Sequence, residues 1–440
     1  MGDFRRCFAL LLAVVLLLSG CTMGSVEDMY QLPKRSEGFA NLQSEIDRAM
    51  AGLEYSAPIR GEHQQIVQMA DLNGDGNTEY ILFAKGNGER PLQVMIFSGD
   101  ADGYGLVDTI EFSGAAFEQV EYLRMDNRPG LELVVTLQLS DEVLRSVSVY
   151  SMISSEMQQR FTVSCTKYQS CDLNEDGMRE LLVLQPGEAE SVNGLAELYR
   201  FVQGTVTRSA QADMSAPADK IRRIITGKLE DGVNAVFVAS DVSGSAIITD
   251  VFAEVDHVFT NISFSSESGT GVQTLRNHYV YADDIDSDGI MELPSLLSMN
   301  LPGDNAGTAQ QHLIRWYSMN SHGQQITKSY SYHNFVGGWY LELDESIASR
   351  IAVVQKGNSY EFVVWDEGKT EVSLLMTVYV LTGQKREEQA ITENRFVLYR
   401  TDSTVYAAKL EVLSGSYNLT KQDLIGDFRL IMQDWKTGET

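Results

Sequence analysis

Short apolar runs separated by polar turns recur along most of the chain. They are rich in Val, Ile, Leu and aromatic residues and lie at 66–69, 80–83, 92–97, 106–112, 145–150 and 159–163. Runs of this length and composition, bounded by Asp, Asn and Gly, are typical of β-strands. The pattern predicts a mainly β protein with about four strands in each unit of about 50 residues.

A polar motif of nine residues precedes several of these runs. It occurs as Asp71-Leu-Asn-Gly-Asp-Gly-Asn-Thr-Glu79, as Asp172-Leu-Asn-Glu-Asp-Gly-Met-Arg-Glu180 and as Asp284-Ile-Asp-Ser-Asp-Gly-Ile-Met-Glu292. Oxygen-bearing side chains stand at positions 1, 3, 5 and 9, and glycine stands at position 6, where the backbone must curl. Because calcium takes about six to eight oxygen ligands on a tightly curled loop, the motif predicts calcium sites.

The predicted ligands are the side chains at those four positions. They are Asp71, Asn73, Asp75 and Glu79 in the first loop, Asp172, Asn174, Asp176 and Glu180 in the second, and Asp284, Asp286, Asp288 and Glu292 in the last. The last loop has a carboxylate where the other two have an asparagine, so we expect it to bind most tightly. Extracellular calcium modules bind at roughly 0.1 to 1 mM.

The motif differs from an EF-hand. An EF-hand has a bidentate glutamate at position 12 and a helix on each side. Here position 12 is Leu82, Val183 or Ser295, and the flanking runs read as strands. An ordinary hairpin turn is the alternative, since Asp, Asn and Gly are common turn residues. Three copies with the same spacing favour calcium.

Two further segments keep the frame of the motif without its ligands. The segment 124–132 has Arg124 and Arg128 at ligand positions, and the segment 227–235 has Ala235 in place of the glutamate. The five copies follow one another at about 50 residues, the length of a four-stranded propeller blade. Separate domains of that size would bury too little apolar surface to fold alone. We therefore predict a five-bladed β-propeller, alternatively with more blades, over residues 62–335.

These loops and their strands resemble the FG-GAP/VCBS-type repeat, whose known examples are calcium-loop β-propellers. The segment from Leu32-Pro-Lys through Tyr55-Ser-Ala-Pro58 to the first loop is similar to the start of a group of bacterial lipoproteins that carry such repeats. The resemblance covers residues 30 to about 335. It implies a fold and a location, and it implies no substrate.

The first 20 residues have the pattern of an export signal. Arg5 and Arg6 precede the apolar run 7–18, which is too short for the roughly 20 residues that span a bilayer. The ending Leu18-Ser-Gly-Cys21 resembles a bacterial lipobox, which implies that Cys21 carries lipid; an unmodified cysteine beside an ordinary cleavage site is the alternative. More than one acyl chain gives stable anchoring. We expect an exported protein anchored at the outer face of the bacterial cytoplasmic membrane.

The segment after the lipid site begins without apolar periodicity. Residues 21–38 are predicted to be a tether, and 39–61 a helix with a lead-in to the first strand. Apolar residues recur there at helical spacing, at Phe39, Leu42, Ile46, Met50 and Leu53. We expect this helix to pack on the propeller or to plug one end of it. Binding of a partner to its apolar face is the alternative.

Charge excludes some partners. The formal net charge is −27 at pH 7. A surface this acidic repels nucleic acid and anionic lipid, which are bound through basic patches. Nucleic acid is therefore excluded as a partner, and the membrane is expected to be reached only through the lipid on Cys21.

The calcium spacing is absent from residues 336–440. Apolar runs at 350–354, 360–365, 372–381, 396–399 and 405–408 predict strands. Thr420 is a candidate N-cap for a closing helix with an apolar stripe at Leu424, Phe428, Ile431 and Trp435. We predict a small α+β domain, with two aberrant extra blades as the alternative. The aromatic residues at 330–335, 339 and 340 are expected to form a core at the junction rather than a sugar-stacking surface.

Cys165 and Cys171 lie six residues apart in one predicted strand. An extended separation of about 20 Å is far beyond the roughly 7 Å that a disulfide allows between Cα atoms. They are therefore predicted to be buried free thiols.

The sequence contains no recognisable set of catalytic residues. Gly-x-Ser-x-Gly, P-loop and His-Glu-x-x-His motifs are absent, and the histidines are scattered singly. Ser164-Cys-Thr-Lys167 and Lys436-Thr-Gly438 match two motifs of penicillin-recognising enzymes. Those enzymes place the serine at the start of a helix, whereas here it lies on a predicted strand, so the match is attributed to chance.

The pattern favours a cell-surface binding or scaffolding module that holds an unidentified protein or glycan of the cell envelope. One alternative is an enzyme acting on envelope polysaccharide, which would need carboxylates converging away from the calcium loops. A second is the solute receptor of a transporter, which would need two lobes of alternating strands and helices. A third is an assembly factor for envelope structures.

Overall fold

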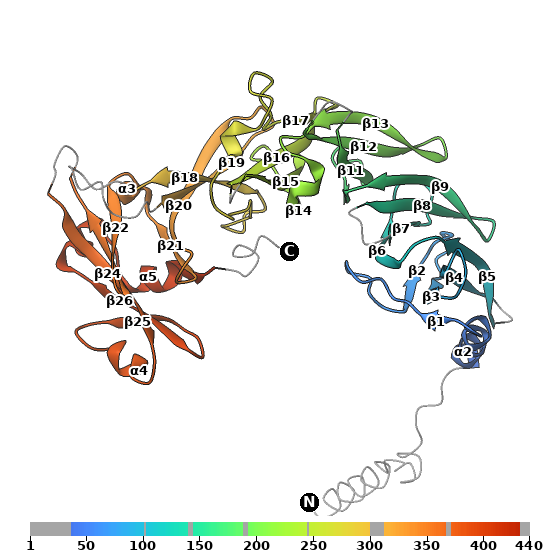
Figure 1. Cartoon of the computed structure of the whole chain (residues 1–440), viewed down its shortest axis with the longest axis horizontal. Helices are drawn as coiled ribbons and strands as arrows, with labels where there is room; N and C mark the ends of the chain where they lie inside the picture. Colours follow the sequence, from blue (N-terminus) through green and yellow to red (C-terminus); the bar gives the residue numbers. More distant parts are fainter. Residues whose placement is uncertain are drawn as a thin grey trace, which may run out of the picture.

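A computed structural model describes residues 37–100, 103–139, 144–187, 192–243, 246–299, 312–366 and 371–431. These residues form six antiparallel sheets of four or five strands. The sheets follow one another along the chain and curve into an arc (Figure 1). The predicted mainly β fold is confirmed. The predicted signal segment with Cys21 lies outside the described residues, as does the predicted tether apart from residues 37 and 38.

The first four sheets are each built from consecutive strands. The first contains β1 (Glu54–Tyr55), β2 (Val67–Ala70), β3 (Glu79–Lys85), β4 (Leu92–Asp100) and β5 (Gly103–Phe112). The second contains β6 (Ala116–Leu123), β7 (Glu132–Gln138), β8 (Arg145–Ile153) and β9 (Glu156–Cys165). The third contains β10 (Lys167–Cys171), β11 (Glu180–Pro186), β12 (Gly194–Val202) and β13 (Thr205–Asp213). The fourth contains β14 (Ile221–Lys228), β15 (Asn234–Ser243), β16 (Ala246–Val255) and β17 (Val258–Asn261).

The last two sheets are interwoven in sequence. The fifth contains β18 (Glu292–Ser298), β19 (His312–Met319), β20 (Gln325–Asn334), β21 (Trp339–Leu343) and the late strand β27 (Phe428–Leu430). The sixth contains β22 (Ile351–Lys356), β23 (Ser359–Val364), β24 (Ser373–Thr382), β25 (Phe396–Arg400) and β26 (Thr404–Leu410). The predicted boundary at residue 336 therefore falls inside the fifth sheet, because β21 and β27 pair there.

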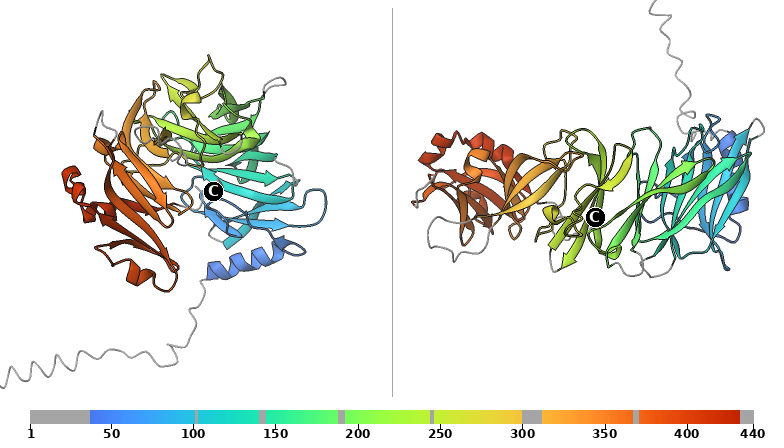
Figure 2. Two further views of the ribbon diagram at one scale, coloured as in Figure 1. Left: turned by 60° about the vertical axis from the view of Figure 1, so that its left-hand side comes forward. Right: turned by 90° about the horizontal axis from the view of Figure 1, so that it is seen from above.

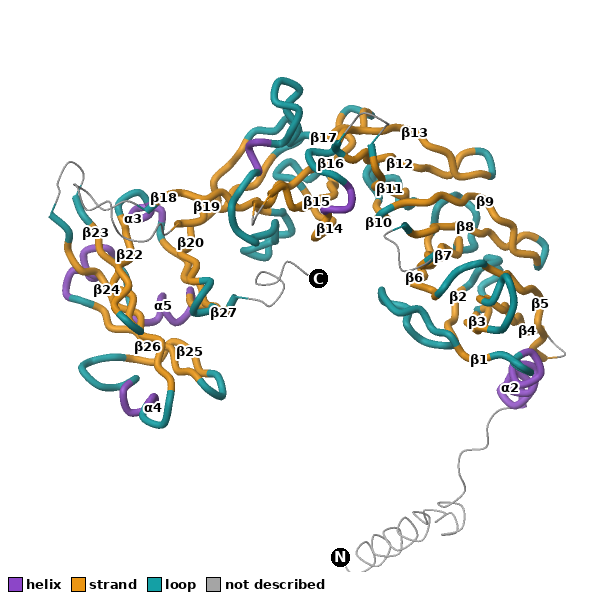
Figure 3. The backbone as a smooth tube through the Cα atoms, viewed as in Figure 1, coloured by secondary structure: helices purple, strands orange, loops and turns teal. Residues whose placement is uncertain are grey.

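Helices are short in the described residues. The α-helices are α2 (Glu37–Ala49), α3 (Glu345–Ala348), α4 (Arg386–Gln389) and α5 (Lys421–Asp427). Short 3₁₀ turns lie at η2 (Ala218–Lys220), η3 (Val272–Thr274) and η4 (Val412–Tyr417). The first strands β6, β10 and β14 lie on the inner side of the arc, and β5, β9 and β13 lie on its outer side (Figures 1 and 3). Figure 2 shows the sheets standing side by side from one end of the arc to the other.

Neighbouring sheets share their cores, and the second strand of a sheet contributes to two of them. In β11, Leu181 and Val183 pack toward the second sheet, whereas Leu182 and Leu184 pack toward the fourth. Successive side chains of a strand point to opposite faces. A strand that is buried on both faces therefore has a continuous apolar run, as the sequence shows at 181–184. No sheet completes its core without its neighbours.

The predicted N-terminal helix is present and covers the free face of the first sheet. Leu42 and Ile46 of α2 are buried against Leu82, Met95 and Phe97. The apolar face of the helix is therefore used inside the molecule, as expected for a helix that packs on the sheets. Leu42 and Ile46 are therefore not available to a partner, which disfavours the alternative of a partner-binding helix.

The aromatic residues at the junction form a core between the fifth and sixth sheets, as predicted. Trp339 is 0% exposed and packs with Tyr332, Phe362 and Phe428. Trp339 and Phe428 stack with ring centroids 5.5 Å apart. The late strand that carries Phe428 therefore fixes the sixth sheet to the fifth.

The closing helix is only partly as predicted. Thr420 caps α5, and its side chain and that of Asp423 form a reciprocal capping box. The helix ends at Asp427, however, and Phe428 pairs with Leu341 of β21 instead of continuing the helical stripe. Pairing with an existing sheet edge overrides the local helical periodicity here. Trp435 lies outside the described residues.

Cys165 and Cys171 are buried and free, as predicted. The prediction that one strand carries both is wrong, because Cys165 ends β9 and Cys171 ends β10 in the next sheet. The chain turns at Thr166, whose N–H donates to the carbonyl of Leu184 over 3.0 Å.

Replacing Trp339 with alanine should destabilise the protein by about 3 to 5 kcal/mol, the usual cost of removing a buried tryptophan side chain. Because Trp339 lies between two sheets, both should unfold more easily, and denaturant titration followed by circular dichroism measures the loss. Val336→Ala three residues away is the control, since Val336 is 96% exposed. A Trp339→Ala protein as stable as this control would contradict a shared core.

Candidate metal centres

A buried glutamate begins one strand in each of four sheets. Glu79, Glu132, Glu180 and Glu292 are each at most 3% exposed and are the first residues of β3, β7, β11 and β18. In every case one carboxylate oxygen accepts the N–H of the residue seven positions earlier. The donors are Leu72 (2.8 Å), Met125 (3.0 Å), Leu173 (2.8 Å) and Ile285 (3.1 Å). The four loops therefore share one frame, including the loop at 124–132 that lacks most of the ligands.

The glycine at position 6 has the predicted conformation. Gly76, Gly177 and Gly289 have φ values of 88°, 79° and 86°, which favour glycine. Their N–H groups donate to the carboxylates at position 1. The acceptors are Asp71 (3.0 Å), Asp172 (3.1 Å) and Asp284 (3.0 Å). The first aspartate thus closes the curl of each loop.

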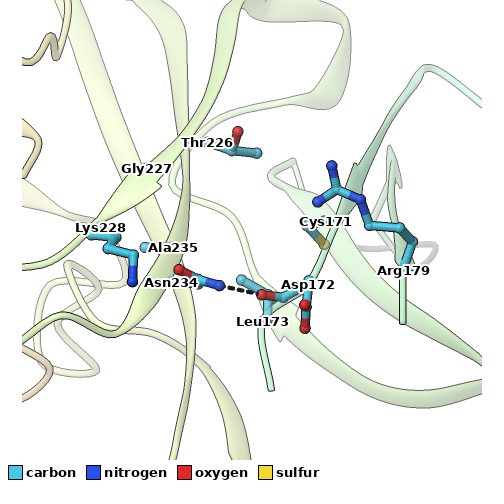
Figure 4. A pocket seen from close by; sticks show the side chains of 9 residues that line it. All are labelled: Cys171, Asp172, Leu173, Arg179, Thr226, Gly227, Lys228, Asn234 and Ala235. Atoms are coloured by element: carbon cyan, nitrogen blue, oxygen red, sulfur yellow. Dashed lines mark hydrogen bonds between the residues drawn. The ribbon is translucent and has the colours of Figure 1, made fainter. Parts of the chain in front are cut away.

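Successive loops are joined to one another by hydrogen bonds. The N–H of Leu131 donates to the carbonyl of Asp71 over 3.0 Å, and that of Arg179 donates to Arg124 over 2.7 Å. The N–H of Met291 donates likewise to Lys228 over 2.9 Å. At the remaining junction the side chain of Asn234 donates to the carbonyl of Asp172 over 2.7 Å (Figure 4). The loops therefore lie in one row, in equivalent surroundings from sheet to sheet.

The last loop brings three carboxylates together. One oxygen each from Asp284, Asp286 and Glu292 lie within 4.8 Å of one another, a group that could hold a metal ion. Oε1 of Glu292 is buried and accepts no hydrogen bond from the described residues. Burial first, and then the charges of the neighbouring aspartates, raise the pKa of Glu292 to about 7. A cation at this place would offset both effects.

Asp288, also a predicted ligand, lies outside this cluster. Its Oδ1 accepts the N–H of Ile290 over 2.8 Å, and its Oδ2 lies 3.6 Å from Nζ of Lys328. The cluster of the last loop therefore contains three of the four predicted side chains.

In the first loop, neutral donors occupy the glutamate oxygen that is free in Glu292. Asn73 Nδ2 donates to Oε1 of Glu79 over 2.8 Å and to Asp75 over 3.2 Å. The Ser98 hydroxyl donates to the same Glu79 oxygen over 3.1 Å. The predicted side chains do meet, but as hydrogen-bond partners of one another.

In the second loop an arginine takes that place. Nε of Arg200 donates to Oε1 of Glu180 over 3.1 Å, and Asn174 donates to Asp176 over 2.9 Å. Oδ1 of Asp172 is buried without a hydrogen-bond partner among the described residues. This loop therefore holds one cation of its own chain beside its glutamate.

The loop at 124–132 is the clearest case of such replacement. Nη2 of Arg128 donates to Oε1 of Glu132 over 2.8 Å and to Ser151 over 2.9 Å, and Nε donates to Asp126 over 2.7 Å. The sequence predicts a loop that has lost its metal, and the structure shows that Arg128, at ligand position 5, places a positive charge beside Glu132.

In the other degenerate copy, at 227–235, the loop between the strands is shorter than the nine-residue motif predicts. Residues 229–233 join β14 to β15, whereas eight residues separate the corresponding strands in the first three sheets. The N–H of Leu229 donates to the carbonyl of Val233 over 2.8 Å, so the backbone closes this turn without a glutamate.

The structure also shows where the Ser-x-x-Lys match lies and whether a described helix could span a membrane. Ser164 lies exposed on β9 and Lys167 begins β10, so the Ser-x-x-Lys match is not on a helix; Lys436 to Gly438 lie outside the described part. Within that part, none of the helices is both long enough and apolar enough to cross a membrane.

Comparison with known proteins identifies no family. No family model matches the chain, and no curated protein matches it in sequence. Similar solved structures include the exotype rhamnogalacturonan lyase YesX (TM-score 0.31, 11% identity, 73% of this chain and 65% of that one). They also include a protein from Lactobacillus plantarum (TM-score 0.24, 9% identity, 74% of this chain and 95% of that one). This chain thus spans less than two thirds of YesX, and TM-scores this low assign no function.

Replacing Arg128 with methionine should leave the Glu132 carboxylate buried without its cation and cost about 3 kcal/mol at pH 8. Burial raises the pKa of Glu132, and without Arg128 the carboxyl should take up a proton more readily, so the loss should shrink toward pH 5. Denaturant titration at both pH values measures it.

The double variant Arg128→Met, Glu132→Gln is the matched control for that experiment. It removes the charge together with its partner and should recover most of the lost stability. If the single variant matches the wild type at pH 8, or if the second change recovers nothing, Arg128 does not neutralise Glu132.

The raised pKa of Glu292 predicts a pH-dependent stability of the metal-free protein. Between its usual pKa and about 7 the folded protein holds a proton that the unfolded chain has released. Stability in chelator should therefore fall as pH rises from 5 to 7. Melting temperatures at unit pH steps measure this; Glu292→Gln should flatten the profile, and the exposed Glu89→Gln should leave it unchanged. A flat wild-type profile would contradict the assignment.

Proposed function

We propose that this protein is a binding or scaffolding module built on a calcium-stabilised β-propeller and held at the outer face of a bacterial membrane through lipid on Cys21. Each of the six sheets would act as one blade. Support for the propeller comes from the consecutive strands of the first four sheets, the cores shared between neighbours and the row of equivalent loops.

The observation that carries the metal assignment is that one loop frame holds an internal cation in one copy and leaves the corresponding glutamate oxygen without a donor in another. In the loop at 124–132 the glutamate oxygen receives the guanidinium of Arg128. In the last loop the corresponding oxygen of Glu292 has no donor in the described residues and faces Asp284 and Asp286. Carboxylates alone, without His or Cys, favour a hard cation such as calcium over zinc.

The role of the metal in this proposal is structural. Glu292 begins β18, and Asp284 and Asp286 lie in the loop before it, so an ion shared by them would fasten the loop to its strand. Because the loop is also bonded to Lys228 at the end of β14, the ion would stiffen the contact between the fourth and fifth sheets. Ions that bind only the folded state stabilise it by mass action.

The antiparallel sheets of the described residues do not match the alternating strands and helices expected of a transporter's solute receptor. A binding module at the envelope also agrees with the acidic composition, which keeps an exposed protein soluble. The envelope partner is an unidentified protein or glycan.

Melting of the mature chain (residues 21–440) with calcium and with chelator tests the proposal. Calcium at 100 times its dissociation constant should stabilise the fold by about 2.7 kcal/mol. Asp284→Asn with Asp286→Asn should abolish the effect. Asp219→Asn should preserve it, because that side chain is about half exposed, lies outside the loops and pairs with Lys220. Equal melting temperatures with and without calcium would reject the metal assignment.

A further inference from the structure

Two adjoining cavities lie along the first strands on the inner side of the arc. The smaller, of about 200 Å³, is lined by residues of the second, third and fourth sheets and by Arg60. The larger, of about 580 Å³, continues toward the loops at 124 and 172. Gln119 of β6 and Gln169 of β10 line both cavities. Together the cavities form one groove along β6, β10 and β14, here called the inner groove.

Four cationic side chains gather in the smaller cavity, although the chain as a whole carries a net charge of −27. They are Arg60, Arg145, Lys167 and Arg222. They come from the segment between β1 and β2, from β8, from β10 and from β14, so the fold collects them from distant parts of the sequence. The only carboxylate among the lining residues is that of Glu118.

Two of the arginines already have partners. Nε of Arg145 lies 2.5 Å from Glu118, and Nη1 donates to the carbonyl of Thr166 over 2.8 Å. Nε of Arg222 donates to Asp241 over 2.5 Å. These pairs hold the two guanidinium groups at the edge of the cavity. The carboxylates of Glu118 and Asp241 are thereby already engaged by arginines.

The two remaining cations have little compensation. Arg60 is largely exposed, and its Nε lies 3.9 Å from Glu118, which Arg145 also contacts. Lys167 is half-buried, and no described carboxylate forms an ion pair with it. Burial first, and then the charges of Arg145 and Arg60, lower the pKa of Lys167. The cavity therefore has more positive charge than its carboxylates neutralise, which an anion of a ligand would offset.

The larger cavity has a mixed lining with charges of both signs, from Glu62, Arg124, Asp172 and Arg179. Its lining includes Glu121, Tyr122, Ser170 and His63. The hydroxyl groups of Tyr168 and Ser170 donate to Glu121 over 2.5 and 2.7 Å, so this carboxylate lies in a network of neutral partners rather than in an ion pair. Such mixed donors and acceptors suit the hydroxyl groups of a carbohydrate.

We propose that the inner groove binds a carbohydrate carrying an acidic group, with the carboxylate or phosphate against Lys167 and Arg60 and the sugar ring in the larger cavity. The inference rests on the proposed function, because it names the ligand class of the binding module. The strongly negative chain disfavours densely charged polyanions. An isolated acidic group in the smaller cavity would face four cations and the single carboxylate of Glu118.

Calorimetric titration of the mature chain at low salt tests the proposal with three probes. They are a disaccharide containing glucuronate, the same disaccharide with glucose in its place, and glucose 6-phosphate. We expect the glucuronate or the phosphate probe to bind at least about tenfold more tightly than the neutral sugar. The stronger of the two acidic probes tells whether the site takes a carboxylate or a phosphate.

Variants locate the binding. Lys167→Gln should weaken the acidic probe roughly tenfold or more, and Lys167→Arg should retain most of the affinity. Lys356→Gln is the matched control, because Lys356 is an exposed lysine of the sixth sheet paired with Glu361. Equal melting temperatures of all variants show that each is folded.

Three results would overturn the inference: no binding of either acidic probe, equal binding of acidic and neutral sugars, or wild-type affinity in Lys167→Gln. Stabilisation by calcium without binding of an acidic sugar would reject the inner groove and keep the metal assignment. Binding of an acidic sugar without stabilisation by calcium would keep the inner groove and reject the metal assignment.

Discussion

The buried glutamate that begins one strand in four of the sheets is the constraint on which this architecture depends. One of its oxygens fixes the loop before the strand through a backbone N–H, as Glu132 does with Met125. The other oxygen must be compensated, because an ionised carboxylate that is buried alone is very costly. The compensating group differs among the four loops. It is the Asn73 amide for Glu79, the guanidinium of Arg128 for Glu132 and that of Arg200 for Glu180. In the last loop, no described residue donates to this oxygen of Glu292. One frame thus accommodates a neutral donor, an internal cation or, as proposed, a metal ion.

The frame matters because it links sheets as well as strands. Each loop in the row bonds to its predecessor, and β11 sends alternate side chains into two neighbouring cores. A sheet of about 50 residues buries too little surface to fold alone. The sheets are therefore stable only as a series. At the ends of the arc, α2 covers the first sheet and the aromatic core around Trp339 joins the fifth sheet to the sixth.

The same series explains how a strongly acidic chain builds a local cluster of cations. Arg60, Arg145, Lys167 and Arg222 are far apart in sequence, yet the first strands of consecutive sheets lie beside one another on the inner side of the arc. Partial pairing with Glu118 and Asp241 holds two of the arginines without neutralising the whole cluster. The smaller cavity of the inner groove can therefore be rich in cations although the chain carries a net charge of −27.

The sequence alone determined most of the strands, the α2 helix and the curled acidic loops with glycine at position 6, because each depends on spacing within a few residues. Tertiary structure decided what depends on contacts between distant segments. Only the fold shows that Asp288 faces Lys328, that Arg200 reaches Glu180, and that Phe428 leaves its helix to pair with Leu341. The cations of the inner groove could not be associated from sequence either. Local sequence patterns reflect the preferences of the backbone and of neighbouring side chains. Charge compensation and strand pairing depend instead on which distant groups the fold brings into contact.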